Sequence, residues 1–426
     1  MIRSLIPFRL MAVLFAVALV LNGCDSATDP ADADGAPPTL AQTLNDEEML
    51  APDVLERTLL SDAPLADALA SSELDAARFA DRIVGAAFSI TDDANGNAVV
   101  AFLRDEGGQL SPAGTYATGG TGSGGAIAGS TNPVLVTPSR SFLLAVNAGS
   151  DEVSVFRILK EARSLELVGS VPSGGPLPLS LTLSGDLLYV LNGGREGEPG
   201  NVSGFRLSPA GTLTPVTGGI RTLPEGVMAP PQLGFAPGGR ALLVTDRPSN
   251  VLVAYNVRAN GTLSGARVTP SAGVTPFGFD FDQYGRLFVS EANAPDGPVP
   301  DGSSLSSYER AGNGLAVLDG VVPTNETAAC WTRVIGRYAY VTNTASNTVT
   351  GFRIGLDGSL TRLDEDGITA ATGAAPHDMG VALRYLYVHN RNDGTVSAYR
   401  IRTNGSLSGI GTVGGLPGTA VGVAVF

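Results

Sequence analysis

The chain has 426 residues, of which 43% are hydrophobic and only 16% are charged, well below the roughly 25% of charged residues in an average globular protein. Its 41 acidic and 27 basic residues give a formal net charge of −14. This charge argues against nucleic acid as a partner, because phosphate backbones are bound by basic surfaces. Two cysteines and two histidines exclude a disulfide framework and a histidine-rich metal cage, and we predict neither a metal ion nor a cofactor.

The amino terminus has the pattern of an export signal. Arg3 and Arg9 precede an uninterrupted apolar run over residues 10–21, which is too short to cross a hydrocarbon core ~30 Å thick. Leu21-Asn22-Gly23-Cys24 follows and resembles the lipobox of bacterial lipoproteins. We therefore predict a lipoprotein signal peptide over residues 1–23, lipidation of Cys24, and anchoring of the exported chain to a membrane of the cell envelope. The alternative is an ordinary signal peptide with a chance cysteine.

An acidic segment comes next. Residues 25–82 contain 14 acidic and three basic residues, which leaves a net charge of −11. The first part lacks the apolar content to form a core. Farther on, Ser72 precedes Glu73 and Asp75, the pattern of a helix N-cap with acids in the first turn. We predict that residues 24–82 form an acidic linker with one or two short helices.

Residues 83–426 consist of seven repeats. An aromatic residue recurs near the end of one strand at intervals of 44 to 54 residues, as Phe102, Phe156, Phe205, Tyr255, Tyr308, Phe352 and Tyr399. A leucine follows each of these aromatic residues by seven to nine positions, as Leu110, Leu165, Leu213, Leu263, Leu315, Leu360 and Leu407. Apolar residues alternate within each unit, so the repeats are built from strands rather than helices.

The repeats predict an all-β, seven-bladed propeller. Four short antiparallel strands can be placed in each unit of about 50 residues, which is the pattern of a propeller blade. The first unit begins with Ala86 to Ile90, which matches the second strand of the other units, and the last residues, Gly422 to Phe426, match a first strand. We expect the C-terminal strand to complete the N-terminal blade and close the ring.

The residues Tyr340-Val341-Thr342-Asn343 match the motif for which YVTN propeller repeats are named. With the aromatic and leucine columns, residues 83–426 resemble the seven-bladed lactonase family, which includes propeller-type 6-phosphogluconolactonases. The resemblance implies a site for opening a lactone at the top of the central channel, built from His, Arg and Glu residues. In the family, some of these Arg and His residues stand where the first strand of a blade begins, in a Pro-Arg-His-like sequence. Here only Pro376-His377-Asp378 retains that pattern, and the third to fifth units carry Leu177, Pro231 and Phe277 instead.

The last blade contains both histidines. His377 and His389 are equally far from the turn near Arg384, so we predict that they are cross-strand neighbours at the top of one hairpin, beside Asp378, Asn390 and Arg391. A neutral His next to a carboxylate suits general-base catalysis, and Arg391 would stabilise an oxyanion. The alternative is that both histidines are partly exposed loop residues whose ring nitrogens bond backbone carbonyls.

A polar residue ends the second strand of every blade and so surrounds the channel on one face: Asp93, Asn147, Asn192, Asp246, Glu291, Asn343 and Asn390. We select Asp246, Glu291, Asn343 and Asn390 as candidate binding residues, together with Arg195 in an expanded hairpin. The alternative is turn chemistry, since Asn and Asp side chains bond their own backbone. We interpret Cys330 and Trp331 as buried core residues, and the glycine-rich Gly119 to Gly125 as a flexible connection between blades.

These observations favour an exported, lipid-anchored propeller that binds a ligand or partner at the cell envelope without catalysis. The absence of the family's Arg and His positions is the main argument for this hypothesis. The ligand would be a small carbohydrate-like molecule or lactone, or the partner an envelope protein. The alternative is a lactonase-type hydrolase of a sugar lactone, with His377 or His389 as the base.

Overall fold

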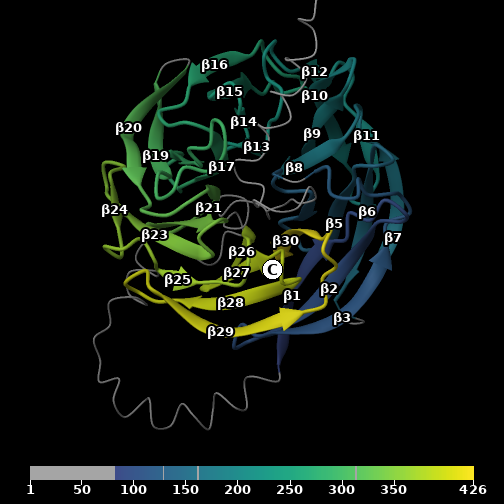
Figure 1. Ribbon diagram of the computed structural model, residues 1–426. Helices are drawn as coiled ribbons and strands as arrows, with labels where there is room; N and C mark the ends of the chain where they lie inside the picture. The colour runs from purple at the N-terminus through teal and green to yellow at the C-terminus, as the bar shows by residue number, and fades with distance from the viewer. Residues whose placement is uncertain (1–81, 128, 161–162, 312–313) are drawn as a thin grey trace, which may run out of the picture.

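The apolar runs of the repeats form strands that are buried along both faces. Neither β5 (Phe142–Asn147) nor β17 (Pro276–Phe281) contains an exposed residue. The computed structural model describes residues 82–426 apart from 128, 161–162 and 312–313, and these residues form thirty strands in seven antiparallel sheets. The sheets stand as seven blades around a central axis (Figure 1). The predicted all-β, seven-bladed propeller is therefore confirmed.

Each blade is described from the axis outward. Blade 1 contains β30 (Val421–Val425), β1 (Ile83–Ile90), β2 (Ala98–Asp105) and β3 (Leu110–Ala117). Blade 2 contains β4 (Val134–Val136), β5, β6 (Glu152–Leu159) and β7 (Ser164–Pro172). Blade 3 contains β8 (Pro178–Ser184), β9 (Leu187–Arg195), β10 (Glu198–Leu207), β11 (Leu213–Pro215) and β12 (Arg221–Thr222). Blade 4 contains β13 (Leu233–Phe235), β14 (Ala241–Asp246), β15 (Val251–Asn256) and β16 (Arg267–Pro270).

The second half of the ring repeats the arrangement. Blade 5 contains β17, β18 (Leu287–Glu291), β19 (Ser304–Ala311) and β20 (Gly314–Pro323). Blade 6 contains β21 (Ala329–Ile335), β22 (Tyr338–Asn343), β23 (Thr348–Ile354), β24 (Leu360–Arg362) and β25 (Ala370–Ala371). Blade 7 contains β26 (Pro376–Ala382), β27 (Tyr385–Asn390), β28 (Thr395–Ile401) and β29 (Leu407–Gly414).

The ring closes within blade 1, as the ends of the chain predict. Strand β30 pairs with β1 through Ala87 opposite Val425 and Phe88 opposite Ala424. The N–H and C=O of Phe426 bond the C=O and N–H of Ala86. Arg104 donates to the carbonyl of Phe426 over 3.0 Å. Strand β1 is thus paired on both sides, with β2 and with β30, and β30 takes the innermost position of blade 1.

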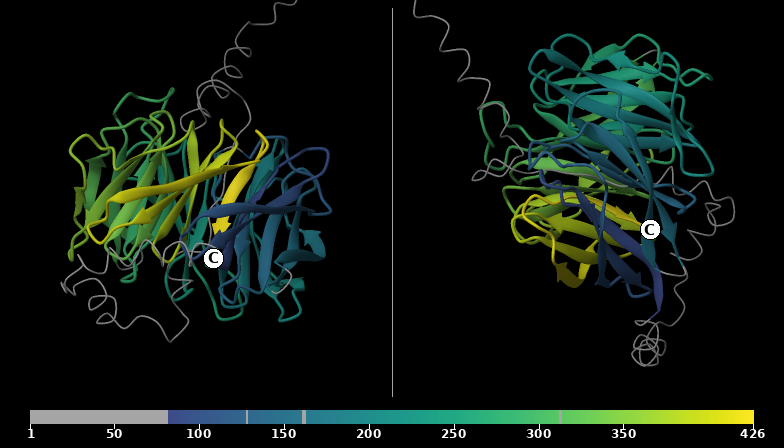
Figure 2. Two further views of the ribbon diagram at one scale, coloured as in Figure 1. Left: turned by 90° about the horizontal axis from the view of Figure 1, so that it is seen from below. Right: turned by 90° about the vertical axis from the view of Figure 1, so that its right-hand side faces the viewer.

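The antiparallel order of each blade defines two faces of the ring. The upper face carries the hairpins between second and third strands and the connections from one blade to the next. The lower face carries the turns between first and second strands and between third and fourth strands. Strand β1 begins and β30 ends at the lower face, so the C-terminus lies on one side of the disc (Figure 2).

Side chains of the innermost strands bond the backbone of the neighbouring blade. Gln232 bonds both the N–H and the C=O of Phe279, at 2.9 and 2.8 Å. Asp280 accepts from the N–H of Val334 over 3.0 Å. These contacts join blades 4, 5 and 6 near the axis, where no strand pairing is available between blades.

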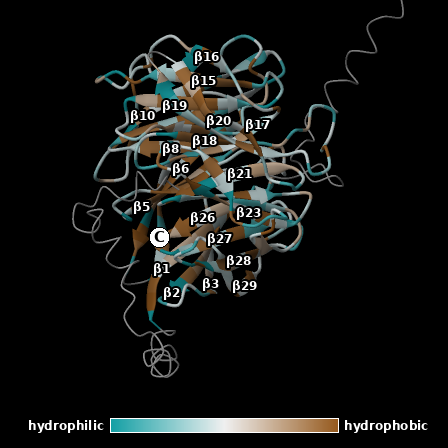
Figure 3. Ribbon diagram, turned by 90° about the vertical axis from the view of Figure 1, so that its left-hand side faces the viewer, coloured by the Kyte–Doolittle hydropathy of each residue, from teal (hydrophilic) through white to brown (hydrophobic). Residues whose placement is uncertain are grey.

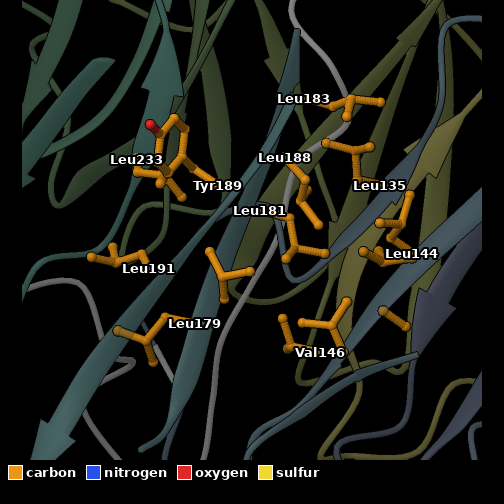
Figure 4. Packing of buried hydrophobic residues seen from close by; sticks show 14 of the residues in the cluster. Leu135, Leu144, Val146, Leu179, Leu181, Leu183, Leu188, Tyr189, Leu191 and Leu233 are labelled. Atoms are coloured by element: carbon orange, nitrogen blue, oxygen red, sulfur yellow. The ribbon is translucent and has the colours of Figure 1, made fainter. Parts of the chain in front are cut away.

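Hydrogen bonds of the same kind, from a side chain to the backbone of the next blade, also join blades 6, 7 and 1. Arg333 donates to the carbonyl of Met379 over 2.9 Å, and Asp378 accepts from the N–H of Val423 over 2.7 Å. Between blades, the aliphatic and aromatic side chains pack into hydrophobic clusters, one of which Figure 4 shows around Leu181, Leu188 and Tyr189. Hydrophobic residues are concentrated along the strands (Figure 3). Among the residues described, no helix has the length and apolar character needed to span a membrane.

Candidate functional site

A row of four side chains from consecutive blades lies at the upper end of the innermost strands. The guanidinium carbon of Arg247, from the β14–β15 hairpin, lies 5.2 Å from the ring centroid of Phe277 in β17. Phe277 contacts the edge of Trp331 in β21, with centroids 4.9 Å apart, and Trp331 stacks on His377 in β26 at 4.6 Å. All four side chains are at most 9% exposed. We call these four residues the mouth row.

The connection from blade 1 to blade 2 covers the mouth row from across the channel. The indole N–H of Trp331 donates to the carbonyl of Ser130 over 3.4 Å. The N–H of Thr131 donates to the carbonyl of Pro231 in blade 4. The carbonyl of Asn132 accepts from Leu181 in blade 3. Because these three adjacent residues bond three different blades, the connection crosses the upper end of the ring.

The glycine-rich loop before this connection is held by one buried carboxylate, so the prediction of a flexible link is wrong. Asp92 accepts hydrogen bonds from the N–H and the hydroxyl of Ser123, both at 2.6 Å, and from the N–H of Gly125 at 3.0 Å. Burial raises the pKa of Asp92 to about 6. A side chain on Gly122 would collide with the backbone of Asp92, so the glycine permits this close approach.

The two histidines are neighbours along the backbone, as predicted, but their side chains do not meet. Pro376 pairs with Asn390 and Met379 with Val388, with a bulge between these pairs, so His377 and Asp378 both lie opposite His389. His377 faces Trp331 in blade 6. His389 shares the opposite face of β27 with Tyr387, whose hydroxyl bonds Gly108 in blade 1.

Neither histidine is exposed, so the alternative that both are partly exposed loop residues is wrong. His377 and His389 are each 0% exposed and belong to strands β26 and β27. Both ring nitrogens of His389 lack a hydrogen bond to any described residue. Burial alone lowers the pKa of His389 to about 4. The imidazole is therefore neutral at pH 7.

Asp378 takes part in a buried series of charges rather than in a pair with His389. Its carboxylate lies 3.9 Å from the guanidinium of Arg333, a separation suited to charge attraction but too long for a hydrogen bond. Burial raises the pKa of Asp378 well above its usual range, and Arg333 opposes this shift. Burial likewise raises the pKa of Asp280 to about 6, against the pull of Arg333. The series joins blades 5, 6 and 7 near the axis.

The polar residues at the ends of the second strands stabilise their own blades. The four asparagines donate through their side-chain nitrogens to hydroxyls on the third strand: Asn147 to Ser154, Asn192 to Ser203, Asn343 to Thr350 and Asn390 to Ser397, over 2.7 to 3.1 Å. All four asparagines are 0% exposed. In the first blade the buried acid is Asp92, and the predicted Asp93 is exposed.

Asp246 and Glu291 each bond the connection that leads into their own blade. Asp246 accepts from the N–H groups of Met228 and Ala229 at 3.2 and 2.9 Å. Glu291 accepts from the N–H of Gly273 at 3.1 Å and from the hydroxyl of Ser304 at 2.5 Å. Burial raises the pKa of Glu291. Of these four candidates, Asp246 accepts from the N–H of Ser249 in its own turn, as the alternative of turn chemistry expects. Asn343 and Asn390 bond third-strand hydroxyls instead, and Glu291 bonds Gly273 and Ser304.

Arg195 is half-exposed and spans two blades. Its guanidinium forms a two-pronged ion pair with Asp151, at 2.6 and 2.8 Å, and donates to the carbonyl of Ala148. This contact fixes the expanded hairpin of blade 3 against blade 2. Arg391 is only 4% exposed and begins the β27–β28 hairpin. Cys330 and Trp331 are buried, as predicted, whereas Cys24 lies outside the described residues.

Sequence reasoning missed Arg247 and undervalued Trp331. Arg247 and Arg391 occupy the same position, the first residue after the polar residue that ends the second strand. A search for charged residues at that position would have found both. The stacking of Trp331 on His377 depends on the contact between two blades, which no pattern within one repeat reveals.

Comparison with known proteins agrees with this architecture. Residues 95–218 match the family model described as "Lactonase, 7-bladed beta-propeller". No curated protein matches the chain. Two solved structures are named putative 6-phosphogluconolactonases. The one from Bacteroides fragilis has 18% identity and a TM-score of 0.60 over 80% of this chain and 97% of that chain. The one from Bacteroides uniformis has 16% identity and a TM-score of 0.62 over 80% and 99%.

A third solved structure is the periplasmic gluconolactonase PpgL of Pseudomonas aeruginosa. It is 16% identical to this chain, with a TM-score of 0.62 over 80% of this chain and 99% of that chain. At these identities the three structures are similar to the chain in fold, and fold does not fix function.

Proposed function

We propose that the chain is a member of the lactonase propeller family that hydrolyses a sugar lactone at the upper end of its channel. The observation that carries this proposal is the mouth row, because it brings a cation, two aromatic rings and an imidazole from four blades into one continuous contact. The match to a lactonase family model over residues 95–218 supports the same reaction class. It favours the hydrolase over the non-catalytic hypothesis.

The proposed chemistry assigns one role to each polar member. Water attacks the lactone carbonyl carbon, the ring C–O bond breaks, and a carboxylate and a hydroxyl form. His377 accepts the proton of the attacking water and returns a proton to the leaving alkoxide. The cation of Arg247 stabilises the oxyanion, and Arg391, which lies outside the mouth row, is the second candidate for this role. His389 takes no part, because it lies on the opposite face of β27 with its pKa lowered to about 4.

The test is the rate at which the purified chain opens phosphorylated and unphosphorylated sugar lactones, relative to buffer. We expect acceleration by the native chain and a loss of about 100-fold or more in kcat/KM for His377→Gln, as for removal of a general base. His389→Gln is the matched control, since it changes an equally buried histidine of the same blade, and it should retain activity. Melting temperatures establish that both variants fold.

A second candidate function is non-catalytic ligand binding, and the loss of the family's Arg and His positions in blades 3 to 5, where Leu177, Pro231 and Phe277 stand, favours it. If no lactone in the panel is opened faster than in buffer, the hydrolase proposal fails and binding replaces it. Activity that survives His377→Gln would keep the reaction but assign it to other residues, Arg247 and Arg391 first.

A further inference from the structure

Exposed charges are unevenly divided between the two faces of the ring. On the lower face the exposed cations outnumber the exposed acids. Among the described residues the cations are Arg82, which pairs with Glu106, and Lys160, Arg163, Arg240, Arg258, Arg310, Arg337, Arg353, Arg384 and Arg402. The exposed acids of this face among the described residues are Glu166, Asp186, Glu309 and Asp357, and Glu161 lies outside the described residues. We call this surface the basic lower face.

The upper face has the opposite balance. Its exposed acids are Asp93, Glu196, Glu198, Glu225, Asp296, Asp301, Glu365, Asp366 and Asp393. Within the described part of the chain, the exposed cations outside the lower face are Arg195, which is paired with Asp151, and Arg267 in the outer strand β16. The chain is acidic as a whole, so a cationic face is not a consequence of composition. It marks a surface suited to a polyanion.

We propose that the basic lower face binds the acidic amino-terminal segment of the same chain, residues 25–81. This segment carries 14 acidic residues and two basic ones, a net charge of −12. It joins the ring at the lower face, because Arg82 precedes β1 and its carbonyl bonds the N–H of Glu106 in the β2–β3 turn. The acidic segment is therefore attached to the ring at the face whose exposed charges are opposite to its own.

Because the acidic segment and the basic lower face belong to one chain, a weak attraction is enough to hold them together. A covalent connection gives an effective concentration on the order of millimolar, so an association too weak to detect between separate molecules is populated within one chain. Fifty-seven residues at up to ~3.4 Å each also reach any part of the disc. Because the attraction is between exposed charges, salt must weaken it as the Debye length shortens.

A groove on the same face accepts apolar side chains. It has a volume of about 920 Å³ and lies between blades 2, 3 and 4. Phe142, Phe235 and Pro237 form apolar walls, while Arg206 and Asp186 at its rim form an ion pair of 2.6 Å. The segment over residues 39–81 is rich in leucine. Its leucines suit the groove while its carboxylates pair with the surrounding cations.

The experiment measures trypsin cleavage after Arg57 and Arg78 in the chain starting at Asp25, at about 20 mM and about 500 mM NaCl, where the Debye length changes from about 20 Å to about 4 Å. We expect cleavage roughly tenfold slower at low salt, as for an attraction of about 1.4 kcal/mol. The lower-face variant Arg337→Glu/Arg353→Glu/Arg384→Glu should lose this protection. The upper-face control Glu198→Lys/Glu225→Lys/Asp296→Lys should keep it.

A second variant leaves the ring untouched. Asp46→Asn/Glu47→Gln/Glu48→Gln weakens the segment's charge and should reduce protection even if the lower-face variant folds poorly. Equal cleavage of the native chain and both charge variants at low salt would overturn the proposal. It would also be overturned if phosphatidylglycerol vesicles bind the native chain through the lower-face arginines while Arg57 and Arg78 stay cleavable, since the cationic surface would then belong to an anionic lipid surface.

Discussion

His389 occupies a position that blades 4, 5 and 6 fill with a hydroxyl residue. The corresponding residues Thr245, Ser290 and Thr342 donate to backbone carbonyls of Phe277, Cys330 and His377 in the next blade, over 2.6 to 2.8 Å. His389 makes no such bond to a described residue. A buried polar ring without a partner costs free energy, and its burial keeps the imidazole neutral.

The first prediction concerns the acid stability that His389 limits. The folded pKa is about 4 and the unfolded pKa is about 6.5, so below pH 6.5 the unfolded chain binds a proton that the folded chain does not. Protonation of the His389 position therefore leaves the free energy of unfolding unchanged above pH 6.5 and lowers it as the pH falls from 6.5 toward 4. The substitution His389→Leu removes this loss. Its effect on the free energy of unfolding should therefore be more stabilising by about 2 kcal/mol at pH 4.5 than at pH 7.5.

Thermal unfolding at the two pH values measures this difference. Burial also raises the pKa values of Asp92 and Asp280 to about 6, which acts in the opposite direction, but both acids are common to the compared chains and cancel. Thr342→Val is the control, because it removes an interblade hydrogen bond without a titrating group. The same destabilisation at both pH values is expected for it. A pH-independent effect of His389→Leu would contradict the burial argument.

At the residue scale, sequence reasoning located the histidines but not their surroundings. Spacing from the turn near Arg384 placed His377 and His389 opposite each other, and the pairing of Pro376 with Asn390 agrees. The bulge that sends their side chains to opposite faces has no sequence signature in this strand. Burial of both rings depends on the neighbouring blades 6 and 1. Such contacts between repeats are set by packing and not by the period of one repeat.

At the scale of elements, the repeat columns predicted the strands closely because each column has one structural cause. The aromatic residues lie in the third strands and are at most 7% exposed. In blade 6, for example, Phe352 of the aromatic column lies in the third strand β23 (Thr348–Ile354). The fourth strands were harder to place, since they are exposed and short, and blade 6 divides its outer edge between β24 and β25.

The second prediction concerns the close contact between innermost strands. A Cβ atom on Gly278 in β17 would lie 2.6 Å from the carbonyl oxygen of Cys330 in β21. Both partners are backbone, so relief requires blades 5 and 6 to move apart. Gly278→Ala should lower the free energy of unfolding by about 1–3 kcal/mol, as for overpacking in a core. Denaturant titration measures the change.

Gly265 provides the matched control. It is exposed, and a Cβ there would meet nothing within 4 Å. Gly265→Ala should leave stability unchanged or slightly increased, because the unfolded chain loses conformational freedom. If Gly278→Ala is no more destabilising than this control, the close approach of the two strands is not a constraint on the ring.

At the scale of the molecule, closure converts seven separate sheets into one body. The pairing of β30 with β1 joins the two ends of the ring in sequence. Elsewhere around the axis, neighbouring blades are joined by hydrogen bonds of four side chains, those of Gln232, Asp280, Arg333 and Asp378. The count of repeats and the unmatched strands at the two ends predicted this closure. The division of charge between the faces was not predicted, because it requires knowing which turns share a face.

The last prediction tests closure itself. Deleting Gly422 to Phe426 removes Val423 and Val425, which are at most 4% exposed, each contributing about 1.5–3 kcal/mol of burial. It also removes ladder hydrogen bonds of about 1 kcal/mol each and the partner of Asp378 at Val423. The total approaches the 5–15 kcal/mol that stabilises a domain, so the truncated chain should aggregate or melt far below the native chain. Replacing Val423 alone with Ala should give an intermediate melting temperature. A truncated chain that melts with the native one would mean that the ring does not depend on this strand.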